Sequence, residues 1–139
     1  MLVTKQVLTL AAAKTIAAAA EQEAVRNKWC VVIAVVDDGG HLLLLHRMDN
    51  TQLASVEVAF QKSKSAMLFK RPTKVLEDVV TGGRNVMMKL AHIVPVEGGL
   101  PLVVDGQIVG AIGVSGVTSP QDGQVAQAGV EELARVLKG

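Results

Sequence analysis

The chain has 139 residues, a length that accommodates one domain with a substantial core and leaves little room for a second. A formal net charge of +1, one tryptophan and two phenylalanines argue against a nucleic-acid-binding surface, which needs a basic field and stacking side chains. Half of the residues are hydrophobic and only 19% are charged, so we expect apolar surface to remain for a partner subunit in a homo-oligomer.

The first predicted element is a helix that covers most of the first 26 residues. Thr4 can cap it, strong helix formers follow to Arg26, and Asn27 tolerates the left-handed conformation that ends many helices. The alanine-rich part resembles a signal peptide, but Lys14 interrupts its apolar run and the helical pattern continues, so we treat residues 1–139 as one domain. No run of about 18 uncharged apolar residues occurs, so no membrane span is predicted.

Residues 30–48, CVVIAVVDDGGHLLLLHRM, predict a β-hairpin around an Asp-Asp-Gly-Gly turn. Both strands are apolar at almost every position, which predicts that both of their faces are covered. Cys30 opens the first strand, and as the only cysteine it has no partner for an internal disulfide. This fits a reducing, cytoplasmic compartment.

Three helical segments are predicted between this hairpin and the next. The first begins at Asn50 or Thr51, either of which can cap it, and runs to about residue 69. The second covers residues 72–80, with a proline suited to its first position and two glycines after its end. A further short helical piece is predicted over residues 85–91.

Residues 98–116, GGLPLVVDGQIVGAIGVSG, predict a second hairpin around an Asp-Gly turn. Its second strand contains Gly110, Gly113 and Gly116, and a glycine inside a strand marks the close approach of another backbone or of a ligand. We interpret the three glycines mainly as places where a helix or a subunit packs closely. A floor for a flat ligand is the alternative.

The last helix is predicted from Ser119, an N-cap that is followed by a proline and by the carboxylate of Asp122, while Gly139 stands where a C-terminal cap belongs. The order of elements is therefore helix, hairpin, helices, hairpin, helix. It predicts an α/β domain of the α+β type, with a mostly antiparallel sheet built from two hairpins and flanked by helices.

Local motifs for catalysis or phosphate binding are absent from the sequence. The segment GAIGVSG lacks the lysine and the spacing of a phosphate-binding loop, and Ser115 does not stand in a GxSxG context. The three histidines lack the spacing of a zinc site, so no metal site is predicted.

His46 and Met48 share a strand face and could both touch a bound haem; the alternative is a structural histidine.

Charged residues at the exit of the first hairpin form another candidate site. Arg47 and Asp49 follow the second strand, and Lys62 lies a few turns into the next helix, so the three could supply an acid, a base and a cation. The alternative is a solvated rim with a weak ion pair. The four cations within residues 62–71 are interpreted as a helix face and its end, where positive charge complements the helix dipole.

Both hairpins, the helix that carries Lys62, the FKRPT boundary and the closing QDGQVAQAG resemble the GlcG/HbpS family of small haem-degrading-protein-like domains, also known as DUF336, over residues 5–137. The resemblance implies a layered α/β domain, an antiparallel sheet flanked by helices, that assembles into symmetric oligomers. The family includes haem-binding members, domains fused to corrinoid enzymes and many members of unknown role, so the fold does not fix the function.

The resemblance carries over no axial haem ligand, because the first helix of this chain has no histidine. The chain departs from the family in two places. Asn27 and Lys28 replace a glycine usual after the first helix, and Gly123 stands where an acidic residue commonly follows Gln-Asp, which weakens any acidic site near the last helix. The residues that match the family by position are Asp37, Arg47, Asp49, Lys62, Gly99, Asp105, Ser115, Gln121 and Asp122.

The leading hypothesis is a cytoplasmic homo-oligomer that binds a small, flat or anionic ligand, with haem or a related tetrapyrrole as the first candidate. One alternative is an enzyme acting on a small organic acid, in which Lys62 or Arg47 binds the carboxylate and Asp49 or Asp122 is the base. Another is a non-catalytic assembly partner of a metabolic enzyme. The candidate ligand-binding residues are His46, Arg47, Asp49, Lys62, Ser115, Gln121 and Asp122.

Overall fold

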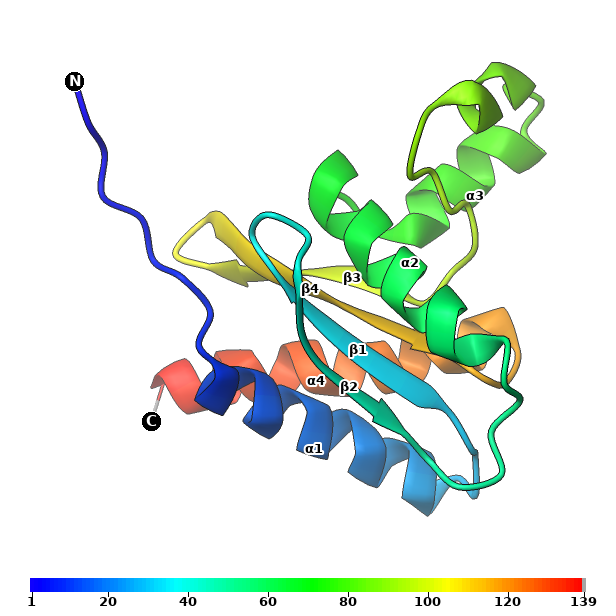
Figure 1. Ribbon diagram of the computed structural model, residues 1–139, viewed down its shortest axis with the longest axis horizontal. Helices are drawn as coiled ribbons and strands as arrows, with labels where there is room; N and C mark the ends of the chain where they lie inside the picture. The colour runs from blue at the N-terminus through cyan, green and yellow to red at the C-terminus, as the bar shows by residue number, and fades with distance from the viewer. Residues whose placement is uncertain (139) are drawn as a thin grey trace.

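The structure, a computed structural model that describes residues 1–138, places a four-stranded antiparallel sheet between two layers of helices (Figure 1). The strands are β1 (Val32–Asp37), β2 (Leu42–Arg47), β3 (Gly99–Val104) and β4 (Gln107–Ser115). Their order in the sheet is β2-β1-β4-β3, so each predicted hairpin supplies two neighbouring strands and the hairpins meet where β1 pairs with β4. The predicted α+β class, with a sheet built from two hairpins, is confirmed.

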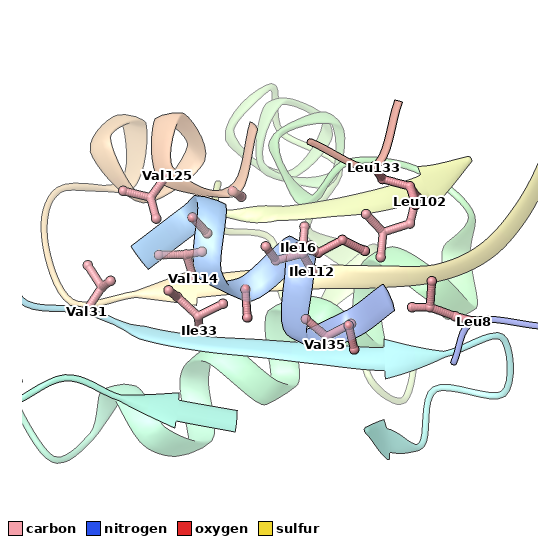
Figure 2. Close-up of a cluster of buried hydrophobic side chains, with 14 of the residues drawn as sticks. Leu8, Ile16, Val31, Ile33, Val35, Leu102, Ile112, Val114, Val125 and Leu133 are labelled. Carbon is pink, nitrogen blue, oxygen red and sulfur yellow. The ribbon is translucent and has the colours of Figure 1, made fainter. Parts of the chain in front are cut away.

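One face of the sheet is covered by α1 (Leu10–Arg26) and α4 (Ser119–Lys138), which lie side by side. The two helices pack closely because α1 turns alanines inward and α4 has Gly129 at their contact, where a Cβ would lie 2.7 Å from Ile112 and 3.0 Å from Ile16. Figure 2 shows the apolar core that results between these helices and the sheet. Its fully buried larger members include Ile16, Val31, Ile33, Val35, Leu102, Ile112, Val114 and Val125.

The opposite face of the sheet is covered by α2 (Ser55–Phe69). After α2 the chain leaves the sheet through α3 (Thr73–Thr81) and the short 3₁₀ helix η1 (Asn85–Lys89), which project to one side in Figure 1. The helices predicted over residues 72–80 and 85–91 are thus confirmed within two residues, the second as a 3₁₀ helix.

The glycines of β4 lie where other backbone segments approach the strand. A Cβ on Gly113 would collide with the carbonyl oxygen of Ala59 and the amide nitrogen of Ser63, both in α2. Cβ atoms on Gly110 and Gly116 would each collide with a backbone carbonyl oxygen of a neighbouring segment. The interpretation that these glycines permit close packing is confirmed, and at Gly113 the neighbour is a helix.

The two strands of the first hairpin are covered to different extents. Residues 32–36 of β1 are fully buried between the helical layers, as predicted. In contrast, β2 forms an edge of the sheet and is only half-buried, with Leu42 47% exposed. The prediction that both faces are covered is therefore wrong for β2, because the helices cover the centre of the sheet more completely than this edge.

The predicted start of the first helix is wrong. α1 begins at Leu10, and the hydroxyl of Thr9 accepts a hydrogen bond from the amide of Ala12 at 3.1 Å. Thr9 is therefore the N-cap in place of Thr4, and residues 1–7 are exposed and outside any helix.

The second helix also begins later than predicted, at Ser55. Asn50 adopts a positive φ of 68°, and the hydroxyl of Thr51 donates a hydrogen bond to the carbonyl oxygen of Met48 at 2.7 Å. Both residues thus form a turn after β2, because their short polar side chains suit a turn as well as a helix cap.

The last helix is capped by Thr118, one residue before the predicted cap Ser119. The Thr118 hydroxyl accepts a hydrogen bond from the amide of Gln121 at 3.4 Å, and the Gln121 side-chain oxygen accepts one from the amide of Thr118 at 3.3 Å. This reciprocal pair is a capping box. The predicted C-terminal cap, Gly139, lies outside the described residues.

Replacing Gly113 by Val tests the close contact between α2 and β4. Neither backbone can move without displacing a helix or a strand, so we expect the free energy of unfolding to fall by about 3 kcal/mol or more. Urea unfolding measures this change. The control is Gly39→Ala, where the new methyl group meets the exposed ring of His41 and lies in ordinary contact with Oδ1 of Asp37. Equal losses in both variants would contradict the prediction.

Candidate functional site

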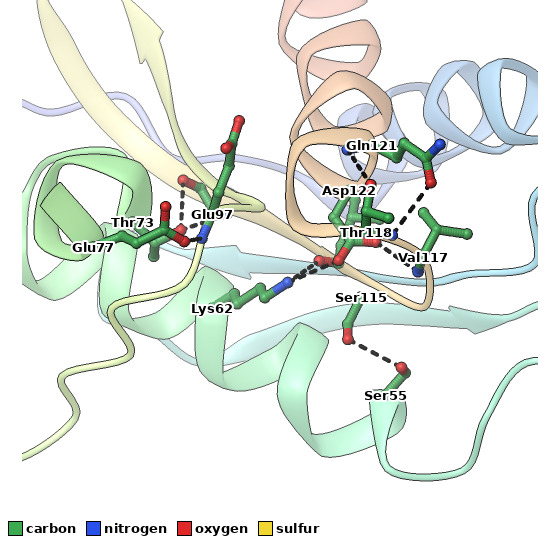
Figure 3. Close-up of polar contacts among 12 residues, drawn as sticks. Ser55, Lys62, Thr73, Glu77, Glu97, Ser115, Val117, Thr118, Gln121 and Asp122 are labelled. Carbon is green, nitrogen blue, oxygen red and sulfur yellow. Dashed lines mark hydrogen bonds and ion pairs between the residues drawn. The ribbon is translucent and has the colours of Figure 1, made fainter. Parts of the chain in front are cut away.

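A buried cluster of polar residues connects α2 with the first turn of α4 (Figure 3). Lys62 of α2 is only 1% exposed, although it is charged and lies in the middle of the helix. Its Nζ donates hydrogen bonds to the carbonyl oxygen of Val114 at 2.9 Å and to Oδ2 of Asp122 at 3.0 Å. Lys62 therefore does not belong to a solvated helix face, and that part of the interpretation of residues 62–71 is wrong.

Asp122 is held in place by the local structure at the start of α4. Its Oδ1 accepts a hydrogen bond from the amide of Val117 at 3.1 Å, and the capping box between Thr118 and Gln121 fixes the turn between them. Burial raises the pKa of the Asp122 carboxyl, and the ammonium of Lys62 opposes this shift. The carboxylate thus has a hydrogen-bonded partner on each oxygen, as a buried charge requires.

The loop before β3 closes the site above Lys62. Gly98 has a φ of +135°, and a Cβ on it would lie 2.8 Å from Nζ of Lys62 and 2.6 Å from the carbonyl oxygen of Val114. The next residue, Gly99, is fixed by Thr73 of α3, whose hydroxyl accepts a hydrogen bond from the Gly99 amide at 2.9 Å. This loop separates the amine of Lys62 from solvent.

Glu97, in the same loop, is a residue of this cluster that sequence reasoning missed. Its amide donates to Oε1 of Glu77 at 3.1 Å, and its own carboxylate lies beside the first turn of α4. A Cβ on Gly123 would come within 2.6 Å of Oε2 of Glu97. The side chain of Glu97 thus fills the space that a side chain at position 123 would otherwise occupy.

Ser115 extends the cluster toward the start of α2. It is buried at the end of β4, and its hydroxyl lies within hydrogen-bond distance of Ser55 Oγ, at 3.0 Å. Ser55 in turn accepts a hydrogen bond from Gln52 at 2.9 Å. Four of the seven predicted site residues therefore lie in one region, but Lys62 and Asp122 are engaged with each other and with backbone, and Ser115 with Ser55. These four are Lys62, Ser115, Gln121 and Asp122.

The other predicted polar residues lie at or just after the end of β2, and β1 separates this strand from Ser115 and the rest of the cluster. Arg47 and Asp49 are exposed, whereas Lys62 and Asp122 are buried. Among residues 1–138, neither Arg47 nor Asp49 forms an ion pair with the other two. The structure does not assemble the predicted set of acid, base and cation.

His46 lies on the other face of β2, beside α1. Its Nδ1 is 3.5 Å from Oε1 of Glu21 and has no hydrogen-bond partner within the described part of the chain, while 41% of the side chain is exposed. Sequence reasoning missed Glu21, because only the sheet register brings α1 beside this strand. Met48 packs against the core on the α1 side of the sheet.

His46 and Glu21 form a histidine–carboxylate pair without a hydrogen bond between them. A histidine that binds a metal through one ring nitrogen commonly donates the N–H of the other to a carboxylate, which orients the ring. Here the carboxylate lies on the Nδ1 side, so Nε2 would be the nitrogen available to a metal. Residues 1–138 contain no group of three histidine, cysteine or acidic side chains that could hold a bare metal ion.

Replacing Lys62 by Met tests the buried pair, because it leaves the carboxylate of Asp122 without its cation. We expect a loss of about 3 to 5 kcal/mol in the free energy of unfolding at pH 7. Burial raises the pKa of Asp122 above its unfolded value, so the folded variant binds a proton more readily than the unfolded chain. The loss should therefore shrink as the pH falls through this raised pKa.

Urea unfolding at pH 7 and pH 5 measures both effects. In the control, Lys62→Met combined with Asp122→Asn, the side chain still accepts the hydrogen bond from Val117 but cannot ionise. In this double variant, the loss of unfolding free energy relative to the unmodified chain should be no smaller at pH 5 than at pH 7. The same recovery in both variants would contradict the assignment to Asp122.

Comparison with known proteins places these features in a family. The family model described as "Haem degrading protein HbpS-like" matches residues 8–131. Protein GlcG of Escherichia coli (strain K12) is 46% identical over 112 residues, which is 81% of this chain and 84% of GlcG.

Solved structures show the same fold. The Klebsiella pneumoniae protein ORFY, assigned to DUF336, matches with a TM-score of 0.88 at 36% identity, over 96% of this chain and 97% of ORFY. The structure described as a PduOC:heme complex matches with a TM-score of 0.84 at 29% identity, over 91% of this chain and 95% of that one. The matched residues include both hairpins, α2 and the start of α4, and the resemblance seen in the sequence is confirmed. The chain belongs to the HbpS-like family.

Proposed function

We propose that this chain is a homo-oligomeric haem-binding protein in which His46 supplies an axial ligand to the iron. The observation that carries the proposal is the half-exposed His46 ring, whose buried Nδ1 faces Glu21 at 3.5 Å. A relative 29% identical in sequence and similar in fold is described as a complex with heme, which supports haem as the ligand class.

The surface beside His46 suits a flat apolar ligand. Leu44 points to the same face of β2 as His46 and is only partly buried. Val25 follows Glu21 by four residues, so the two share a helix face, and Val25 is exposed. Apolar side chains thus flank the imidazole on both the strand and the helix.

The protein residues in this proposal have separate roles. His46 would hold the iron through Nε2, Glu21 would lie on the Nδ1 side of the ring, and the apolar neighbours would contact the macrocycle. Bound haem would supply a redox-active iron, whose potential depends on hydrogen bonding to its axial ligand. The buried cluster around Lys62 lies with α2 on the opposite face of the sheet and has a structural role in this proposal.

Titration of the purified chain with haemin tests the proposal. We expect a Soret shift that saturates at a fixed ratio of haem to chain, and a loss of affinity of at least tenfold in His46→Ala because the axial bond is removed. His41→Ala is the matched control, since His41 is an exposed histidine in the β1–β2 turn. Absence of saturable binding would reject haem, and equal loss in both variants would reject His46 as the ligand.

A further inference from the structure

The outer edge of β2 presents backbone groups without partners. The amide of Met48 donates to the carbonyl oxygen of Val31 at 3.1 Å, and the register with β1 continues from that pair. In an antiparallel ladder, alternate residues direct both backbone groups to the same neighbour. The backbone amides and carbonyls of Leu44 and His46 therefore point toward β1, whereas those of Leu45 and Arg47 point outward. No hydrogen bond of these outward groups occurs within residues 1–138.

The other edge of the sheet, β3, is blocked over its first half. By the same alternation, the outward residues of β3 are Gly99, Pro101 and, after the irregularity that follows Leu102, Val103, because the amide of Val114 donates to the carbonyl of Gly98 and Val104 pairs with Gln107 across the turn. Pro101 has no amide hydrogen, and the hydroxyl of Thr73 accepts from the amide of Gly99 at 2.9 Å. Within residues 1–138, β2 therefore offers a further strand a longer run of free backbone groups than β3 does, and natural sheets rarely leave such an edge unprotected.

We infer that β2 pairs with β2 of a second copy of this chain, antiparallel about a two-fold axis at Leu45. The strand has the composition that this pairing needs, with leucines at positions 42–45 and no charge among them. In this register Leu45 exchanges both backbone hydrogen bonds with Leu45 of the second copy. The pairing joins two four-stranded sheets into one continuous sheet.

Charge at the two ends of β2 supports the same partner. Arg47, at one end, is exposed and forms no ion pair with any residue that the structure describes. At the other end, Asp37 closes β1 and accepts hydrogen bonds from the amides of Gly39 and His41, and Asp38 in the turn forms an exposed ion pair with Lys5 at 2.7 Å. A two-fold axis at the middle of the strand brings the Arg47 end of each copy toward the acidic turn of the other, so the edge is complementary to itself.

The pairing also completes the proposed haem site, and this part of the inference rests on the proposed function. His46 is adjacent to the axis, and in this register it lies opposite Leu44 of the second copy. Both His46 rings would lie on the same face of the continuous sheet, near the line where the copies meet. The second copy thus supplies an apolar wall that a single chain lacks beside its half-exposed histidine.

The mass of the apoprotein in solution tests the pairing without haem. Light scattering after gel filtration should give an even multiple of the chain mass, and Leu45→Pro, which removes an outward amide, should reduce that mass at least twofold. Leu45→Ala is the matched control, because it loses the same side-chain packing but keeps the amide, and it should retain the assembly. A monomeric unmodified chain, or a folded Leu45→Pro protein with unchanged mass, would overturn the inference.

Hydrogen exchange of the unmodified chain gives a test that does not depend on folding of the proline variant. In the assembled apoprotein the Leu45 amide should be protected at least 100-fold relative to that of Gly106, which lies in the exposed β3–β4 turn. Equal exchange of the two amides would overturn the pairing. Both measurements use the protein without haem. A failure of haem binding would therefore reject the proposed function and leave the strand pairing to be judged by these two results.

Discussion

The fold depends on the burial of one lysine between its two layers. Lys62 belongs to α2 on one face of the sheet, Asp122 begins α4 on the other, and the ammonium also bonds the end of β4. A charge in this position must keep its partners, because an unpaired ammonium in the interior is far more costly than an exposed one. Its hydrogen bonds therefore specify where α4 starts relative to α2. Gly98 and the capping box are arranged around the same contact.

The order and type of the elements could be predicted from the sequence because each hairpin has a turn of aspartate and glycine between apolar runs. The starts of α1 and α2 could not, since threonine and asparagine suit both turns and helix caps, and tertiary contacts decide between these conformations. A glycine inside a strand, such as Gly113, predicts that another segment lies close to it. Only the structure identifies this segment as the backbone of α2.

The polar cluster was partly predictable, through residues that match the family motifs, but its burial was not. Other cations follow Lys62 closely in the sequence, and this pattern is typical of a solvent-exposed helix face. Glu21 and Glu97 carry no local signal, because each reaches its neighbour from an element distant in the chain. Arg47 and Asp49 were grouped with Lys62 by sequence proximity, although the strand and the helix present them to different surroundings.

The unequal edges of the sheet also determine how far association can proceed. When two copies join through β2, the new sheet ends on both sides in β3, where Thr73 occupies the amide of Gly99 and Pro101 offers none. Further strand addition is therefore less favourable at these ends than at β2. A finite particle is favoured over the open fibril that an exposed apolar edge strand can otherwise nucleate.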